Sequence, residues 1–409
     1  MLKFDVVVFG AGPAGTVASS YLARKGFNVL VLERASFPRF VIGESLLPSC
    51  MDDFNEAGLL EGIDQSKYQI KYGATFVSGE KKCSFSFDEQ YSESWSYTYQ
   101  VERAKLDMDL AQQAIKNGVE IRFQSEVKSV DAKESQQITH FENAKGEQES
   151  VESRYIIDAS GYGRVLPRLF DLEKPSSMAA RTAVFSHFND AGNSQVDRNK
   201  IEVHVVDESN AWLWLIPLAN DCVSVGMVSS LEKANEFQLN ESDNFVGFLK
   251  NFKGIEKRFK KTEALRAVDQ LSGFSVAVKK KYGEGYVLCG NSTEFLDPIF
   301  SSGVALATKS ALLAAKALER KLTGEQVDWS LEYEMPISES IDVFRSYIKA
   351  WYEGDLQKVF FAEKIDPTIK NQICSVLAGH VRDTTNPFVK KHKTIIKTLA
   401  KVLEIQNRK

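Results

Sequence analysis

The sequence predicts an α/β fold in three parts: a mostly parallel sheet with helices, an antiparallel sheet that interrupts it, and a helical C-terminal region. The chain opens with an apolar strand from Asp5, a glycine-rich turn and a small-residue helix. Residues 180–230 alternate between apolar and polar side chains, with turn residues between the runs, which is typical of antiparallel strands. Beyond Leu322 the chain is helical in character and carries aromatic clusters.

The first element is a strand–turn–helix unit with a G-x-G-x-x-G fingerprint. The apolar run Asp5–Phe9 leads into Gly10-Ala11-Gly12-Pro13-Ala14-Gly15, and Glu33 follows the next strand, Val29–Leu32. The first glycine permits the tight turn, the second allows a pyrophosphate close to the backbone, and the third lets helix and strand pack. The helix N-terminus also favours phosphates. We therefore predict a dinucleotide site in which Glu33 accepts hydrogen bonds from ribose hydroxyls, with a glycine turn that binds nothing as the alternative.

The later elements return to the same sheet after interruptions. A helix is expected over Arg103–Ile115, followed by a short strand at 119–123 and a polar hairpin at 131–146. Further strands are expected at 154–161 and 286–291, with a small-residue helix after Gly303. The Rossmann-like cofactor domain is thus discontinuous. We expect it at 1–75, 101–175 and 282–325, with a substrate domain at 76–100 and 176–281 and a helical cap at 326–409.

Composition and charge exclude several classes of protein. The 409 residues carry a net charge of −4, which disfavours a nucleic-acid partner because such a partner needs a concentrated basic face. The first strand begins at Phe4, and no apolar run approaches the roughly 18 residues of a membrane span. We therefore expect a cytoplasmic protein without a transmembrane segment. The five cysteines are scattered and lack a C-x-x-C motif, which predicts reduced thiols and no metal site.

The end of the chain combines apolar spacing with many lysines. Residues 389–409 set isoleucine, leucine and valine side chains against Lys390, Lys391, Lys393, Lys397 and Lys401, which predicts one amphipathic basic helix. An acidic partner or a membrane surface is one interpretation of this helix. The other is a helix packed on the domain with its lysines in water.

Three further segments resemble one family. They are Phe37-Pro38-Arg39-Phe40-Val41-Ile42-Gly43-Glu44-Ser45-Leu46-Leu47-Pro48, Trp212-Leu213-Trp214-Leu215-Ile216-Pro217 and Phe295-Leu296-Asp297-Pro298-Ile299-Phe300-Ser301-Ser302-Gly303. The second and third fit the W-x-W-x-I-P and F-x-x-P-x-x-S-x-G signatures of the flavin-dependent halogenases, and the resemblance spans nearly the whole chain. The wider superfamily contains aromatic hydroxylases and geranylgeranyl reductases, and all three branches imply FAD.

The resemblance also implies residue roles. Arg39 and Arg103 would lie along the cofactor, and Asn291 stands where the family has an aspartate that holds the ribityl chain; an amide can still hydrogen-bond hydroxyls. The full set of expected cofactor contacts is Gly10, Gly12, Pro13, Ala14, Gly15, Glu33, Arg34, Arg39, Ser45, Arg103, Asp158, Gly161, Gly290, Asn291, Pro298 and Gly303. Halide or substrate contacts are expected from Ser301, Ser302, Gly303, Trp212, Trp214 and Phe300.

Lys71 matches the lysine that halogenases place between flavin and substrate. A desolvated ammonium or amine can hold hypohalous acid or form a haloamine. The alternative is an ordinary surface lysine on a strand. Tryptophan halogenases carry a glutamate where this chain has Phe300, so the resemblance favours the phenol and pyrrole branch, whose substrates are often carrier-bound.

The sequence contains no second glycine fingerprint for a nicotinamide cofactor. Either NAD(P)H visits transiently or a separate flavin reductase supplies reduced FAD. The favoured function is halogenation of an electron-rich aromatic substrate with reduced FAD, oxygen and chloride or bromide. The alternatives are an aromatic hydroxylase or polyene reductase on the same scaffold, and a flavin-binding protein without turnover.

Overall fold

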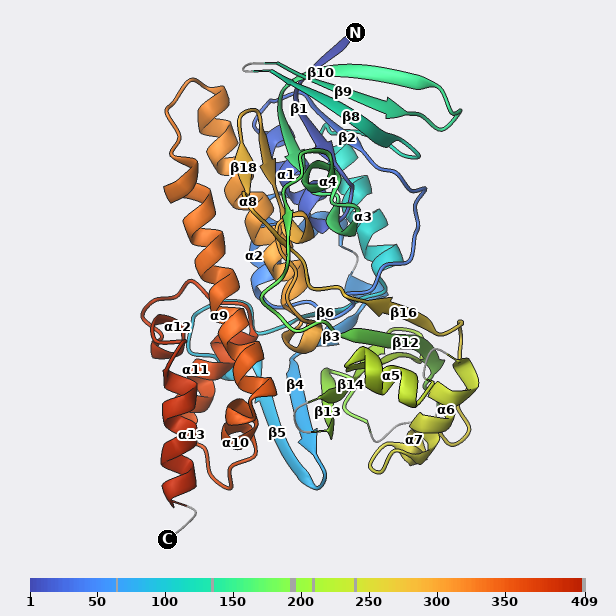
Figure 1. Ribbon diagram of the computed structural model, residues 1–409, viewed down its shortest axis with the longest axis vertical. Coiled ribbons are helices and arrows are strands. Elements are labelled where there is room, and N and C mark those ends of the chain that lie inside the picture. The colour runs from blue at the N-terminus through green and yellow to red at the C-terminus, as the bar shows by residue number, and fades with distance from the viewer. Residues whose placement is uncertain (64, 134–135, 192–195, 208–209, 239–240, 407–409) are drawn as a thin grey trace.

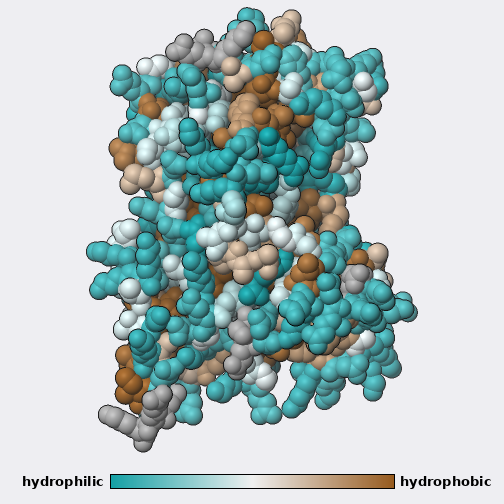
Figure 2. All heavy atoms as spheres, in the orientation of Figure 1, coloured by the Kyte–Doolittle hydropathy of each residue, from teal (hydrophilic) through white to brown (hydrophobic). Residues whose placement is uncertain are grey.

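The computed structural model describes residues 1–63, 65–133, 136–191, 196–207, 210–238 and 241–406. In the orientation of Figure 1, one large sheet with its helices lies above a second large sheet, and the C-terminal helices run along one side of both. Hydrophilic side chains cover most of the face drawn in Figure 2, and apolar ones gather mainly in its upper middle part. The predicted α/β fold is confirmed.

The upper sheet has eight strands around a parallel core. Its main path runs β18 (Tyr282–Gly283), β19 (Tyr286–Leu288), β10 (Gln148–Asp158), β1 (Leu2–Phe9), β2 (Val29–Leu32) and β7 (Glu120–Arg122), and β9 (Gln136–Glu142) and β8 (Glu126–Lys133) continue from β10. The strands from β19 to β7 pair in parallel. Residues 6–9 of β1 are buried to 1% exposure or less, as expected of a parallel strand covered on both faces.

Three long helices cover this sheet on the side of the fingerprint. They are α1 (Pro13–Arg24), α3 (Arg103–Lys116) and α8 (Ser302–Leu322), and α1 packs against both of the others. Pro13 at the first position of α1 lacks the N–H that would otherwise be unpaired there. The short helices α2 (Ser49–Glu56) and α4 (Val165–Leu169) complete this half.

The lower sheet has seven strands. Its order is β16 (Asp269–Ser272), β12 (Thr182–Asn189), β15 (Cys222–Ser229), β14 (Ala211–Leu218), β13 (Lys200–Asp207), β4 (Gly73–Ser78) and β5 (Lys81–Ser86). All neighbours are antiparallel except β13 and β4, which run parallel. One face packs on α6 (Ser242–Asn251) and α7 (Glu256–Phe259) through an apolar cluster that includes Leu213 and Phe245. The short helix α5 (Leu231–Glu236) contacts β12. The other face turns toward the upper half.

Two small ladders connect the halves. β3 (Gln69–Lys71) pairs with β6 (Thr98–Gln100), and β11 (Glu173–Lys174) pairs with β17 (Ala277–Val278). The expected domain boundary at residue 75 falls inside β4, because the chain leaves β3 and enters the lower sheet within two residues.

The C-terminal region is helical: α9 (Met335–Tyr352), α10 (Asp355–Phe360), α11 (Pro367–Leu377), α12 (Pro387–Lys390) and α13 (Ile395–Gln406). The prediction of one helix over 389–409 was wrong, because α12 ends at Lys390 and a turn precedes α13; residues 407–409 lie outside the described part. In that turn His392 Nδ1 hydrogen-bonds Ser346 Oγ at 2.7 Å, which fixes the turn against α9. Within the described residues, no helix combines the length and apolar character needed to cross a bilayer.

Candidate active site

The glycines of the fingerprint are required by close backbone contacts. Gly10 adopts φ +93°, and a Cβ there would lie 2.7 Å from the carbonyl oxygen of Ala159. A Cβ on Gly15 would lie 1.9 Å from the carbonyl oxygen of Gly10. Gly12 differs, because a Cβ there would meet nothing closer than Arg39 Nη2 at 3.7 Å. The missing side chain of Gly12 therefore leaves space on the cavity side, where a pyrophosphate can approach the backbone.

Glu33 holds the fingerprint loop in place. One carboxylate oxygen accepts from Ala11 N at 2.9 Å, and the other accepts from Ala35 N at 2.8 Å. Glu33 is 6% exposed and lines the cavity described below. Each oxygen keeps a second lone pair that can accept from a ribose hydroxyl.

Two arginines share one buried carboxylate beside the loop. Arg103 donates to both oxygens of Asp107 at 2.9 and 3.0 Å, and Arg39 donates to Asp107 at 3.0 Å. Asp107 is fully buried, and both arginines line the cavity. Arg39 Nε also lies 3.8 Å from Glu33 Oε1, so two guanidinium groups balance two carboxylates here. The N–H groups of the arginines that face the cavity can still donate to a bound pyrophosphate.

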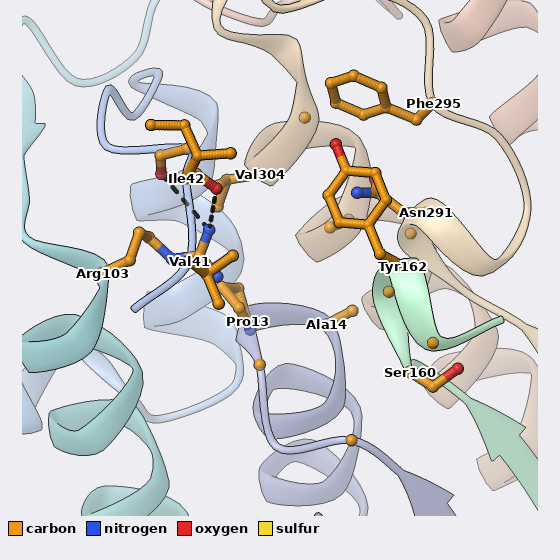
Figure 3. Close-up of a pocket in the computed structure, with 18 of the residues that line it drawn as sticks. Pro13, Ala14, Val41, Ile42, Arg103, Ser160, Tyr162, Asn291, Phe295 and Val304 are labelled. Atoms are coloured by element: carbon orange, nitrogen blue, oxygen red, sulfur yellow. Dashed lines mark hydrogen bonds between the residues drawn. The ribbon is translucent and has the colours of Figure 1, made fainter. Parts of the chain in front are cut away.

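A single cavity of about 550 Å³ joins the fingerprint loop to the inner face of the lower sheet. Figure 3 shows Val41, Ile42 and Val304 on one side of it, with Tyr162, Phe295 and Asn291 across from them. The expected contact residues that line it are Gly10, Gly12, Pro13, Ala14, Glu33, Arg34, Arg39, Ser45, Arg103, Gly161, Gly290, Asn291, Pro298, Ser301, Gly303, Trp212 and Trp214. Gly15, Asp158, Phe300, Ser302 and Lys71 lie behind its wall.

Asp158 organises the turns around the cavity from behind. It is fully buried at the end of β10 and accepts from Ser160 N, Ser160 Oγ, Leu166 N and Ser292 Oγ at 2.6–2.9 Å. Burial raises the pKa of Asp158, and these hydrogen bonds oppose that rise. The carboxylate therefore fixes the turn that carries Gly161 and the segment that carries Asn291, and its own oxygens are occupied by protein donors.

The far end of the cavity is an aromatic wall from β14. Trp212 Nε1 donates to Tyr352 Oη at 2.8 Å, and Trp214 Nε1 donates to Ser224 Oγ at 3.2 Å. Both indole N–H groups are thus paired within the protein, and the rings offer apolar surface to the cavity. Gly226 on β15 lies opposite Trp214, and a Cβ there would lie 2.1 Å from its ring.

The loop before α8 forms another side of the cavity. Asp297 caps a 3-10 turn at Pro298–Phe300 by accepting from Ile299 N at 3.0 Å, and it accepts from Tyr352 Oη at 2.9 Å. Burial raises the pKa of Asp297 to about 6. Ser301 follows in the left-handed region at φ +57° and lines the cavity. Phe300 points away from it, with its ring against Phe76, Tyr347 and Trp351.

Lys71 lies at the end of β3 and is only 1% exposed. Its Nζ donates to Ser45 Oγ and to the carbonyl of Leu46, both at 2.8 Å, and lies 5.4 Å from the centroid of the Phe87 ring. Nζ forms no ion pair with any residue that the structure describes. Burial lowers the pKa of Lys71 from its ordinary 10.5 to about 7. The alternative of an ordinary surface lysine does not fit this position.

Several site residues were missed at the sequence level. Asp107 lies four residues after Arg103 on α3, a spacing that places both on one helix face and could have indicated the pair. Tyr162 and Phe295, whose ring centroids are 5.7 Å apart, carry no motif that would single them out. Tyr352, which hydrogen-bonds the lower-sheet tryptophan, comes from the C-terminal region. No cluster of three or more His, Cys, Asp or Glu side chains suited to a metal occurs among the described residues.

Comparisons with known proteins identify an FAD binding domain and a flavoprotein of the same fold. The model of the family described as FAD binding domain matches residues 3–335. The crystal structure of a flavoprotein/dehydrogenase from Cytophaga hutchinsonii superposes with a TM-score of 0.97 at 43% identity, over 99% of this chain and 100% of that one.

Two relatives are carrier-dependent halogenases by name. The 1H-pyrrole-2-carbonyl-[peptidyl-carrier protein] chlorinase of Pseudomonas fluorescens is 28% identical over 405 residues, covering 92% of this chain and 89% of the relative. The corresponding brominase of Pseudoalteromonas luteoviolacea is 26% identical over 389 residues and covers 92% of each chain. The resemblance to flavin-dependent halogenases and the prediction of FAD are confirmed.

Proposed function

The chain belongs to the family of proteins with an FAD binding domain, and from this we propose that it binds and uses FAD. We further propose that it halogenates an electron-rich aromatic compound, as the names of its relatives suggest for them. Bound FAD supplies the redox chemistry that oxidises the halide. The fingerprint loop and Glu33 would hold the adenosine half, and Arg39 and Arg103 would donate hydrogen bonds to the pyrophosphate. Asn291 would hydrogen-bond the ribityl chain, and the N–H groups of Ser302 and Gly303 at the start of α8 would attract chloride or bromide.

The placement of Lys71 is the single observation that carries this proposal. Burying an ammonium without a carboxylate partner is costly, so a fold that only needed a strand residue here would gain stability from an apolar side chain. The lysine is separated from the cofactor cavity by one hydroxyl, that of Ser45. Strongly perturbed groups next to a cavity are typical of functional sites.

Lys71 would direct the oxidised halogen to the ring. A pKa of about 7 makes both protonation forms available near neutral pH. In the described position the ammonium would act on hypohalous acid through the Ser45 hydroxyl, and direct formation of a haloamine, with release of water, would require Nζ to move past Ser45. In either route the aromatic carbon gains the halogen and loses its proton, so that hypohalous acid and the arene give haloarene and water. Ser301 and Ser45 lie beside this path.

The substrate class follows from the aromatic wall and from the relatives. Trp212 and Trp214 offer apolar ring surface at one end of the cavity, which suits a phenol or pyrrole ring. Phe300 provides no carboxylate at its position, which disfavours free tryptophan as substrate. The names of the chlorinase and brominase relatives support a ring attached to a carrier protein. Reduced FAD would come from a flavin reductase or directly from NAD(P)H, in the cytoplasm.

Product mass tests the proposal. The purified protein with FAD, a flavin-reducing system and bromide is offered free phenols and carrier-bound pyrrole-2-carbonyl groups, and products are analysed by mass spectrometry with and without bromide. We expect bromide-dependent mass gain in the wild type and none in Lys71→Ala, with FAD binding retained. Lys71→Arg should also fail, because a guanidinium does not deprotonate readily and has a different shape.

Two results would replace this proposal. Oxygen incorporation without halogen would indicate a hydroxylase, and NAD(P)H-linked reduction of a polyene would indicate a reductase. One observation favours the reductase as the second candidate function: the similar protein from Cytophaga hutchinsonii is named a flavoprotein/dehydrogenase. Absence of any oxygen- or NAD(P)H-linked flavin cycle would indicate a flavin-binding protein without turnover.

A further inference from the structure

We propose that Ser45 is the positioning residue through which Lys71 exchanges protons with the cavity. The inference rests on the proposed function, because it concerns how the buried lysine takes part in halogen transfer. Lys71 lies behind the cavity wall, whereas Ser45 is part of the wall. A lysine in this position needs a group that connects it to the reacting molecules.

Strand β6 explains why the two residues meet. The backbone of Ser45 forms a bridge with Gln100 on one side of β6, and Lys71 pairs with Thr98 on the other side. Backbone hydrogen bonds from Val101 N to the carbonyl of Glu44 at 2.7 Å and from Leu46 N to that of Tyr99 at 3.1 Å fix the same segment. The Lys71–Ser45 contact is thus set by a three-strand arrangement and does not depend on a loose loop.

The hydrogen-bond pattern leaves the Ser45 hydroxyl proton available. Ser45 Oγ accepts from Lys71 Nζ at 2.8 Å and from Ser301 Oγ at 3.0 Å, so both of its lone pairs are used. Its own O–H donates to no atom of the described residues. Because Ser45 lines the cavity, this proton is free to meet a molecule bound there.

Ser45 is also the partner of Lys71 that can pass a proton on. Nζ has three protons: one is donated to Ser45 Oγ, one to the carbonyl of Leu46, and the third lies on the side of the Phe87 ring. A peptide carbonyl and an aromatic ring cannot accept and release a proton at ordinary pH. The Cys50 thiol also lies near Lys71, but it is fully buried and does not line the cavity, so it offers no path to a bound molecule. A hydroxyl can accept one proton while it gives up another.

The transfer conserves protons and needs no further reactant. The Ser45 hydroxyl proton passes to a base in the cavity, which is water or the hydroxide left when hypohalous acid gives up its halogen. At the same time a proton moves from Lys71 Nζ to Ser45 Oγ, which restores the hydroxyl and leaves a neutral amine. The reverse movement, with the proton released by the halogenated ring, returns Lys71 to the ammonium.

Three variants separate the relay from general packing. Ser45→Ala removes the hydroxyl, Ser45→Thr keeps it, and Ser86→Ala is the matched control because Ser86 Oγ also accepts from a lysine, Lys200 Nζ at 2.8 Å, but does not line the cavity. We expect product formation to fall about 100-fold in Ser45→Ala, the scale on which a positioned proton donor contributes. We expect Ser45→Thr to remain within about threefold of the wild type, and Ser86→Ala to match the wild type. All variants are compared at saturating FAD, and flavin reoxidation in the same samples should be retained, so that a loss of the expected Ser45 contact with FAD is separated from a loss of the relay.

A measurement independent of turnover tests the same contact. In protein labelled with ¹⁵N-lysine, exchange of the Lys71 Nζ protons with solvent is followed by NMR in the FAD-bound form. Ser45→Ala should slow this exchange at least about tenfold, and Ser45→Thr should restore it. Exchange that is unchanged or faster in Ser45→Ala would overturn the relay, as would wild-type product formation in Ser45→Ala or equal loss in Ser45→Thr. If the wild type makes no halogenated product, the proposed function fails, and the exchange measurement alone decides the relay.

Discussion

Replacing Lys71 by methionine should make the protein more stable while it loses halogenation. Burial lowers the pKa of Lys71 from 10.5 to about 7. This shift means that the charged ammonium destabilises the folded state by roughly 5 kcal/mol. Methionine removes that cost and is apolar and flexible enough to fill the space. It also leaves the carbonyl of Leu46 without its donor, at about 1–3 kcal/mol. The net gain expected below pH 7 is therefore roughly 2–4 kcal/mol.

The pH dependence of that gain gives the sharper test. Above pH 7 the folded protein releases the Lys71 proton, whereas the unfolded chain keeps it up to pH 10.5. The unfolded state then binds more protons, so wild-type stability rises with pH by about 1.4 kcal/mol per unit between these values. The advantage of Lys71→Met should be full below pH 7, shrink above it, and change sign before pH 10.5.

Urea-unfolding midpoints of both proteins, taken from pH 6 to pH 10 at one saturating FAD concentration, measure this difference. Groups other than Lys71 titrate equally in both proteins and cancel in the comparison. A stability difference that does not vary with pH would refute the assignment of a depressed pKa to Lys71. A variant that is already less stable than the wild type at pH 6 would show that the lysine is held by contacts stronger than the two hydrogen bonds described.

Three further changes test the cavity. Gly12→Val should abolish FAD binding, because its side chain would occupy the space in which a pyrophosphate approaches the backbone; undiminished FAD occupancy after purification would contradict the assignment. Asn291→Asp should tighten FAD binding or leave it unchanged, since a carboxylate makes stronger bonds to hydroxyls, and much faster flavin release measured by fluorescence would count against a ribityl contact. Gly226→Val should lower the free energy of unfolding by about 1–3 kcal/mol by displacing the Trp214 ring, and an unchanged urea midpoint would show that the ring has another place to go.

Local sequence patterns predicted the elements that local physics decides. The fingerprint turn, the strand before Glu33 and helix α3 each depend on residues close together in the chain, and their positions in the structure agree within a few residues. The helical cap was predicted from composition, but the break between α12 and α13 was missed. In that break His392 hydrogen-bonds Ser346, 46 residues away, a contact that no local pattern contains.

The arrangement of the site depends on pairings that no local pattern contains. Trp214 lies against Gly226 because β14 and β15 pair in one register, and a shift of one residue would turn the ring to the other face. The resemblance to the family was enough to identify Lys71 as a candidate, but the sequence did not predict that Lys71 lies behind Ser45. That position requires β6 between two segments that are 25 residues apart in sequence.

The C-terminal region reaches the cavity through one hydroxyl. Tyr352, the last residue of α9, accepts from the Trp212 indole and donates to Asp297, so one side chain joins the aromatic wall to the loop that carries Ser301. Arg181 lies over the Tyr352 ring at 3.5 Å and adds a charge on the lower-sheet side. Because Ser301 in turn donates to Ser45, a shift of α9 would be transmitted to the partner of Lys71. The helical cap is therefore hydrogen-bonded to the candidate site as well as packed into the core.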